Sequence, residues 1–106
     1  MPSRRHPPRS VDLPALAAFA RAYLHEDAIV EYGSGFDAAA AFARDASPEE
    51  RRRLVVDLER VIGALEGRRA GRVTRFFAEE LRAGWAPATI DDLRSLIARV
   101  SSIGAR

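Results

Sequence analysis

The sequence predicts an all-α protein, a compact single-domain bundle of about five helices. Apolar side chains recur at the three- and four-residue spacing of helices, and no run alternates as a strand would. Serine, threonine or aspartate precedes several of these runs, where it can cap a helix start. The 106 residues, 47% of them hydrophobic, suffice for one domain with a modest core. No run reaches the ~20 apolar residues of a spanning helix, so we expect no membrane partner.

The first eleven residues differ from the rest of the chain. They combine three prolines with Arg4, Arg5 and Arg9 and contain no acid. We predict a flexible, basic, proline-rich tail over 1–11 and a single helical domain over 12–104. Paired arginines occur in export signals, but Pro7 and Pro8 stand where such signals carry apolar residues. We therefore expect a cytoplasmic protein, and the lack of cysteine fits a reducing compartment.

Two helices are predicted in the first half of the chain. Asp12 can cap the first, with Pro14 in its first turn, and the apolar period continues to about Leu24. Residues 25–35 break this period and end in a Gly-Ser-Gly turn. The alanine-rich run over 36–43 predicts a short second helix.

The third predicted helix has the strongest start signal. Ser47 can cap it, Pro48 suits the first helical position, and Glu50 can reach back to the cap. An apolar stripe follows, and Gly67 can end the helix. The stripe consists of Leu54, Val55, Leu58, Val61, Ile62 and Leu65.

Two more helices are predicted after residue 70. One carries Phe76 and Phe77 and ends at Gly84. The other begins near Thr89, with Asp92 able to complete its cap, and its apolar residues recur at helical spacing. These five segments, joined by short loops, make the predicted bundle.

Charge is unevenly distributed along the chain. All 17 basic side chains are arginine; residues 10–50 hold eight acids and two arginines, whereas 51–106 hold seven acids and twelve arginines. An arginine-rich half suits nucleic-acid binding, and a small nucleic-acid-binding regulator is therefore the alternative function. However, Glu49 with Arg53, and Arg53 with Asp57, have the spacing of ion pairs on a solvated helix face. We therefore do not expect nucleic acid as the partner.

The sequence offers no set of residues for catalysis. Cysteine is absent, and no carboxylate stands at helical spacing from His25 to share a metal ion with it. The acid pairs Glu49-Glu50 and Asp91-Asp92 occupy first turns of predicted helices, where the helix dipole favours negative charge. We therefore expect no enzyme activity, no cofactor, no metal and no small-molecule substrate.

One acidic segment is not explained by predicted caps or ion pairs. It contains no arginine, and its notable residues are Tyr23, Glu26, Asp27, Glu31, Tyr32 and Asp37. Tyrosines among clustered acids are suited to binding a basic partner, with the rings as anchors and the acids as steering charges. Alternatively, the tyrosines are half-buried core residues and the acids solvate a loop. The residues alone leave both interpretations open.

Several short motifs follow one another between residues 13 and 103. They are Tyr23-Leu24-His25-Glu26-Asp27, Glu31-Tyr32-Gly33-Ser34, an Ala/Phe-rich helix with Phe42, Ser47-Pro48-Glu49-Glu50, and Trp85-Ala86-Pro87 before a last helix. In this order they resemble the immunity proteins of contact-dependent growth inhibition systems, the CdiI-type family. Two positions differ from that family's pattern, Ala28 after the first motif and Asp92-Leu93 in the last helix.

The resemblance implies a small cytoplasmic protein that binds and neutralises the C-terminal toxin domain, often a nuclease, of a cell-surface effector. A nuclease is basic where it grips phosphate, so acidic residues would be complementary to it. We therefore hypothesise a toxin-binding surface comprising Tyr23, Glu26, Asp27, Glu31, Tyr32 and Asp37. Tyr23 and Asp27 could instead hold the fold, with Asp27 capping a helix or pairing internally.

Overall fold

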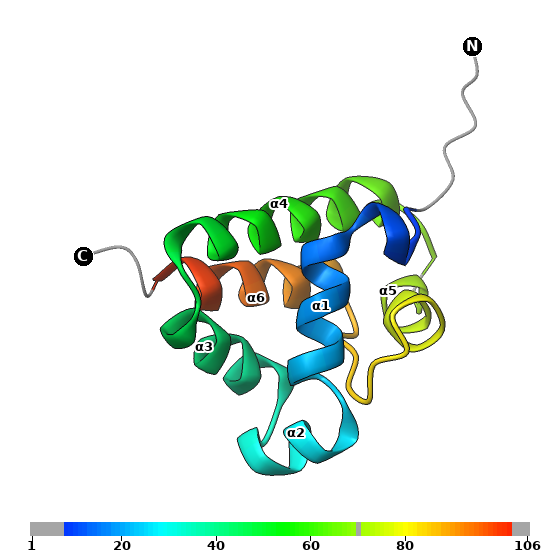
Figure 1. Ribbon diagram of the computed structural model, residues 1–106. Coiled ribbons are helices and arrows are strands. Elements are labelled where there is room, and N and C mark those ends of the chain that lie inside the picture. The colour runs from blue at the N-terminus through cyan, green and yellow to red at the C-terminus, as the bar shows by residue number, and fades with distance from the viewer. Residues whose placement is uncertain (1–7, 70, 103–106) are drawn as a thin grey trace.

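The computed structural model describes residues 8–69 and 71–102, and these residues form helices without any strand (Figure 1). The predicted all-α class is confirmed for this part of the chain. Most of the predicted tail, residues 1–7, lies outside it. The elements are a 3-10 turn η1 (Ser10–Asp12), α1 (Pro14–Tyr23), α2 (Glu26–Tyr32), α3 (Gly35–Asp45), α4 (Pro48–Leu65), α5 (Arg72–Arg75), a π-helical turn η2 (Phe76–Glu80) and α6 (Ile90–Ser102).

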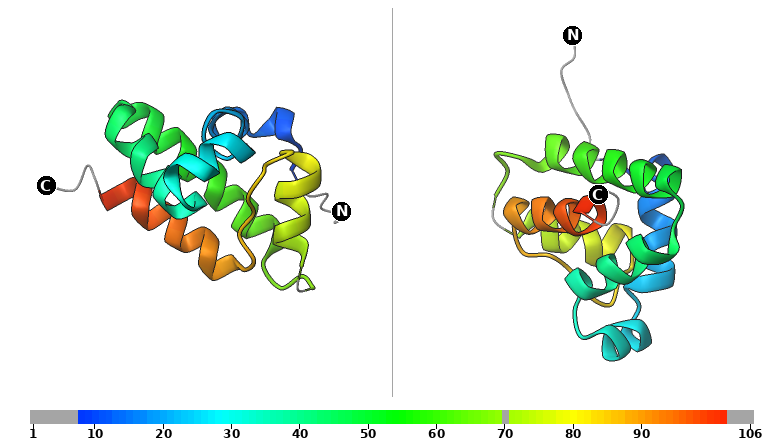
Figure 2. Two further views of the ribbon diagram at one scale, coloured as in Figure 1. Left: turned by 90° about the horizontal axis from the view of Figure 1, so that it is seen from below. Right: turned by 90° about the vertical axis from the view of Figure 1, so that its left-hand side faces the viewer.

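The helices pack around one core. α6 lies against both α3 and α4, and α1 crosses α4 and also contacts α3. The short α2 contacts α1 and α3 and lies at the end of the molecule opposite α4 (Figures 1 and 2). The surface of α2 is therefore remote from the long helix that forms the other side of the bundle.

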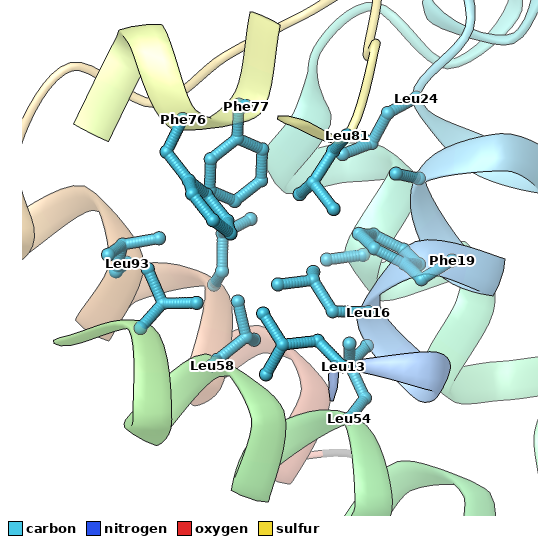
Figure 3. Close-up of a cluster of buried hydrophobic side chains, with 14 of the residues drawn as sticks. Leu13, Leu16, Phe19, Leu24, Leu54, Leu58, Phe76, Phe77, Leu81 and Leu93 are labelled. Carbon is cyan, nitrogen blue, oxygen red and sulfur yellow. The ribbon is translucent and has the colours of Figure 1, made fainter. Parts of the chain in front are cut away.

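The core is built from leucine and phenylalanine side chains of the different helices, which converge in Figure 3. The α4 stripe behaves as predicted, because Leu54, Leu58, Val61 and Leu65 are all buried. Removing such a side chain from water contributes about 1.5–3 kcal/mol, so this stripe holds α4 to the bundle.

Two of the predicted caps are present. In α4 the Glu50 amide donates to Ser47 Oγ at 3.1 Å, and the Ser47 amide donates to Glu50 Oε1 at 2.7 Å. At the start of α6 the Asp92 amide donates to Thr89 Oγ1 at 3.1 Å, and Asp92 accepts from the Ala88 amide. These local signals therefore fix the starts of both helices.

The start of α1 differs from the prediction. Asp12 ends η1 and accepts a hydrogen bond from the Arg9 amide, so it does not cap α1. The cap comes from α4 instead: the buried Asp57 carboxylate accepts from the amides of Ala15 at 2.9 Å and Leu16 at 3.0 Å. These amides have no partner within their own helix, so they satisfy the buried charge.

The predicted ion pair of Arg53 with Asp57 was wrong for the same reason. Asp57 turns inward to α1, and Arg53 instead bonds Glu49 at 2.8 Å, which is the other pair that the spacing predicted.

The structure contains a helix, α2, that the apolar period does not reveal. The Ala28 amide donates to His25 Nδ1 at 3.2 Å, which caps the start of α2. Gly33 ends it with a φ of 100°, a left-handed value that favours glycine. With seven residues, α2 is too short to show a clear period.

The fourth predicted helix is shorter than expected, and its second part is a π-helical turn instead of an α-helix. α5 continues into η2, where the Leu81 amide donates to the Phe76 carbonyl at 3.2 Å. Both Phe76 and its neighbour Phe77 are buried, with their rings edge to face, and Figure 3 shows them in the same cluster. A π turn bonds groups that are five positions apart in the chain, and here it accommodates two consecutive buried aromatics.

Gly84 does not end this helix. It lies in the following connector, where its amide donates to the Leu24 carbonyl at 2.6 Å. A Cβ at Gly84 would come within 2.7 Å of the Glu26 backbone nitrogen. Glycine is therefore needed here for close approach to the loop between α1 and α2.

The adjacent Trp85 packs onto the start of α3. A Cβ on Gly35 would overlap the indole ring of Trp85, and that ring meets Phe36 edge to face at a centroid distance of 5.1 Å. The connector before α6 therefore contacts the chain immediately before α2 and immediately after it.

We expect Gly35→Ala to lower the free energy of unfolding by about 1–3 kcal/mol, because the new methyl group must displace the Trp85 ring. Gly63→Ala is the matched control: it lies within α4 with no atom near the new methyl group, and it should raise stability by about 0.5–1 kcal/mol. Urea unfolding of both variants checks this. Unchanged stability of Gly35→Ala would contradict the packing argument.

We expect Asp57→Ala to cost about 2–3 kcal/mol, because it leaves two amides at the start of α1 without their charged acceptor. Asp57→Asn keeps an acceptor oxygen and should cost less. Glu59→Ala changes an exposed acid on the same helix and should alter stability by no more than about 0.5 kcal/mol. Equal losses in Asp57→Ala and Glu59→Ala would show that the cap contributes nothing.

Candidate functional site

Four of the six predicted site residues lie on α2, namely three acids and Tyr32. Glu26 and Asp27 occupy its first turn, Glu31 follows one turn later, and all three side chains are exposed. α2 contains no basic residue. α2 lies at one end of the molecule (Figure 1). Its exposed carboxylates form an acidic surface, which we call the acidic face of α2.

His25, rather than Asp27, caps α2. The capping role suggested for Asp27 is therefore taken by His25. Negative charge in a first turn is favoured by the helix dipole, which gives Glu26 and Asp27 a modest structural role besides any binding role.

Val30 also belongs to this surface, although it was not identified from the sequence. Its side chain is 84% exposed, next to Glu31 and one turn after Glu26 and Asp27. A single exposed valine is ordinary, and this one adds an apolar side chain to a helix face that carries three exposed carboxylates. Val30 would have been found only if residues 26–32 had been recognised as a helix.

The two tyrosines lie together, beneath and beside α2. Tyr23 ends α1 and Tyr32 ends α2, and their rings stack at a centroid distance of 5.9 Å. Tyr23 also stacks on Phe19 and meets the edge of Phe42. Both tyrosines are half-buried and pack against the core. The structure therefore gives them a packing role, joining α2 to α1 and α3.

Asp37 lies apart from the acidic face of α2, in the first turn of α3. Its carboxylate accepts from Ser34 Oγ at 3.2 Å and lies 3.6 Å from the Arg99 guanidinium. A local hydrogen bond and an ion pair therefore explain the position of Asp37. Neither contact was expected from the sequence, and for this residue that expectation was wrong.

The environment of Tyr23 is negatively charged as well as apolar. Burial raises the pKa of its hydroxyl above the usual 10.0, and the charge of the Asp45 carboxylate raises it further. Tyr32 and Glu50 add smaller effects in the same direction. Tyr23 thus lies where negative potential and partial burial coincide.

Several arginines of the second half make contacts within the protein. Arg51 donates to the carbonyls of Ala43 and Ala46, which stabilises the end of α3. Ion pairs join Arg53 to Glu49, Arg75 to Glu79, Arg94 to Asp91 and Glu66, and Arg99 to Asp37. Three arginines, Arg69, Arg72 and Arg75, line a small hollow of about 330 Å³.

Within residues 8–69 and 71–102, no cluster of three or more histidine and carboxylate side chains could hold a metal ion. None of the helices there combines the length and the apolar content needed to cross a membrane.

No family model and no curated protein matches this sequence. Among solved structures, the fold is similar to a chain in the crystal structure of the CdiA-CT/CdiI complex from Y. kristensenii 33638. The TM-score is 0.71 at 15% sequence identity, and the alignment covers 84% of this chain and 98% of that chain. At this identity the likeness shows a shared fold over nearly the whole of the other protein.

We expect the stability of the protein to fall at alkaline pH in part through Tyr23. Its hydroxyl is neutral in the folded and the unfolded chain below about pH 10, and above this the unfolded chain ionises first. Stability is therefore lost as the pH rises through the raised pKa of the folded state. Tyr23→Phe should lose less free energy of unfolding than the unaltered protein between about pH 9 and pH 12. Urea unfolding across this range measures it, and parallel losses would contradict the raised pKa.

Proposed function

We propose that this protein is an immunity protein that binds and neutralises the C-terminal toxin domain of a contact-dependent growth inhibition effector. The observation that carries the proposal is the fold, which is shared with a chain of a CdiA-CT/CdiI complex. The order of motifs from Tyr23 to Pro87, which resembles the same family, supports it independently of the fold.

The acidic face of α2 is the proposed site of contact with the toxin. Its three carboxylates and Val30 are exposed. If the toxin is a nuclease, its phosphate-binding surface is basic, and these carboxylates can occupy that surface in place of phosphate. Val30 would then supply the apolar contact at the centre of the charged surface.

The two tyrosines support this surface from below. Their stack holds the end of α2 against the end of α1, which fixes the direction in which the acids project. Asp37, already paired with Arg99, would lie at the margin of the toxin contact. This role requires binding and no catalysis, and it would be carried out in the cytoplasm of the cell that is protected.

A growth experiment tests the proposal. The C-terminal domain of the large surface protein encoded beside this gene is expressed with and without this chain. We expect the domain alone to arrest growth and co-expression to restore it. Persistent growth arrest in cells that contain the soluble, folded chain would contradict the proposal for that toxin.

The contribution of the acidic face is tested on the purified pair. We expect the double variant Asp27→Arg, Glu31→Arg to slow association about tenfold at low salt and much less at high salt, because steering between charges is screened. Glu59→Arg, a charge reversal at an exposed acid of α4, is the matched control and should associate as the unaltered chain does. Unchanged rates of the double variant at both salt concentrations would remove these two acids from the interface.

A further inference from the structure

A groove runs along a second face of the protein, between α1, the end of α3 and the first half of α4. Its volume is about 720 Å³. The apolar part of its lining includes Ala18, Phe19, Ala22, Tyr23, Phe42 and Val56. Ala18 and Ala22 are exposed, and Val56 is 47% exposed. The groove therefore offers apolar surface that the helices of this chain leave open.

Charge at one end of the groove is negative. Asp45 and Glu50 lie near Tyr23, where their charges act on its hydroxyl. Glu49 lies on the same rim and is paired with Arg53, so Asp45 and Glu50 set the charge at this end.

At the opposite end of the groove, near the start of α1, the carboxylate is already engaged in hydrogen bonds within the protein. Asp57 lies there, and it is satisfied by the first amides of α1, while Val56 and Arg52 line the groove beside it. The acidic end and the apolar floor thus lie next to each other around Tyr23 and Phe42.

Asp45 is the last residue of α3, where a carboxylate opposes the helix dipole. Arg51 offsets part of this effect by donating to the Ala43 and Ala46 carbonyls at the same helix end. A residue that breaks a local rule of this kind is a candidate for a role outside folding.

We infer that this groove docks a segment of the toxin domain that carries an aliphatic side chain next to a lysine or arginine. The aliphatic side chain would pack on Ala18, Ala22 and Phe42. The cation would lie between Asp45 and Glu50, against the ring of Tyr23. The inference rests on the proposed function, since it assigns a second contact to the same partner.

The groove and the acidic face of α2 are connected by one row of aromatic rings. Tyr23 belongs to the groove and stacks on Tyr32 at the end of α2. A typical stable interface covers about 800 Å² on each partner, more than one exposed helix turn provides. A toxin domain that covers both surfaces would reach this size.

The first test measures affinity for the toxin domain. Asp45→Arg replaces an acid by a base at the end of α3, so it should preserve or raise stability while weakening toxin binding at least about tenfold. Ala22→Arg fills the groove and should have a similar effect on binding. The matched control is Ala98→Arg, the same change at an exposed position of α6, which should bind as the unaltered chain does.

The outcomes separate the two proposals. If the unaltered chain binds the toxin domain and both groove variants bind equally well, the groove is not a docking site and the proposed function stands. If the unaltered chain does not bind the domain at all, the proposed function fails.

A second test examines the groove without the toxin. Short amidated peptides of alternating leucine and arginine are titrated into the nitrogen-15-labelled protein, with peptides of alternating leucine and glutamate as the charge control. We expect amide shifts around Ala22, Phe42 and Asp45 with the basic peptide only, and their loss in Asp45→Arg. Shifts elsewhere, or none, would overturn the inference.

Discussion

The carboxylate of Asp57, buried in α4, accepts hydrogen bonds from the first amides of α1, and the other contacts of α1 depend on this position. Breaking a buried charge away from its partners is far more costly than losing an exposed ion pair. If α1 slid along α4, Asp57 would lose both bonds together. The acid therefore sets the register of α1, which delivers Leu16 and Phe19 to the core and places Tyr23 at the far end. The groove along α1 and the stack that supports α2 both follow from that register.

The short helix α2 is held by contacts at its two ends. A seven-residue helix is not stable by itself in water, so its order must come from neighbours. Gly84 approaches the backbone at its start, Trp85 packs on Gly35 just after its end, and Tyr32 stacks on Tyr23. These approaches are possible because Gly35 and Gly84 have no side chain. The connector before α6 thus holds α2 in place, and the exposed acids of α2 owe their position to residues more than fifty positions away in the sequence.

Local signals in the sequence were sufficient for α4 and α6, whose stripes and caps are complete within a few residues, as Ser47 with Glu50 shows. They were insufficient where the decisive partner is distant: Asp57 caps a helix 42 residues earlier, and its i, i+4 neighbour Arg53 suggested a different role. The acids of α2 could be identified as an exposed cluster from their composition. Val30 could not, because its exposure depends on a helix too short to be recognised. The groove combines α1, α3 and α4 and has no signature in any one segment.

The outer positions of α2 are separated from those that hold it in place. Ala28, Ile29 and Tyr32 face the bundle, whereas Glu26, Asp27, Val30 and Glu31 face solvent. Substitutions at the outer four positions leave the core untouched, so each should change the folding free energy by no more than about 0.5 kcal/mol. The surface that we propose for toxin binding can therefore change one residue at a time while the chain continues to fold. Under the proposed function, this freedom would let the surface follow changes in the toxin.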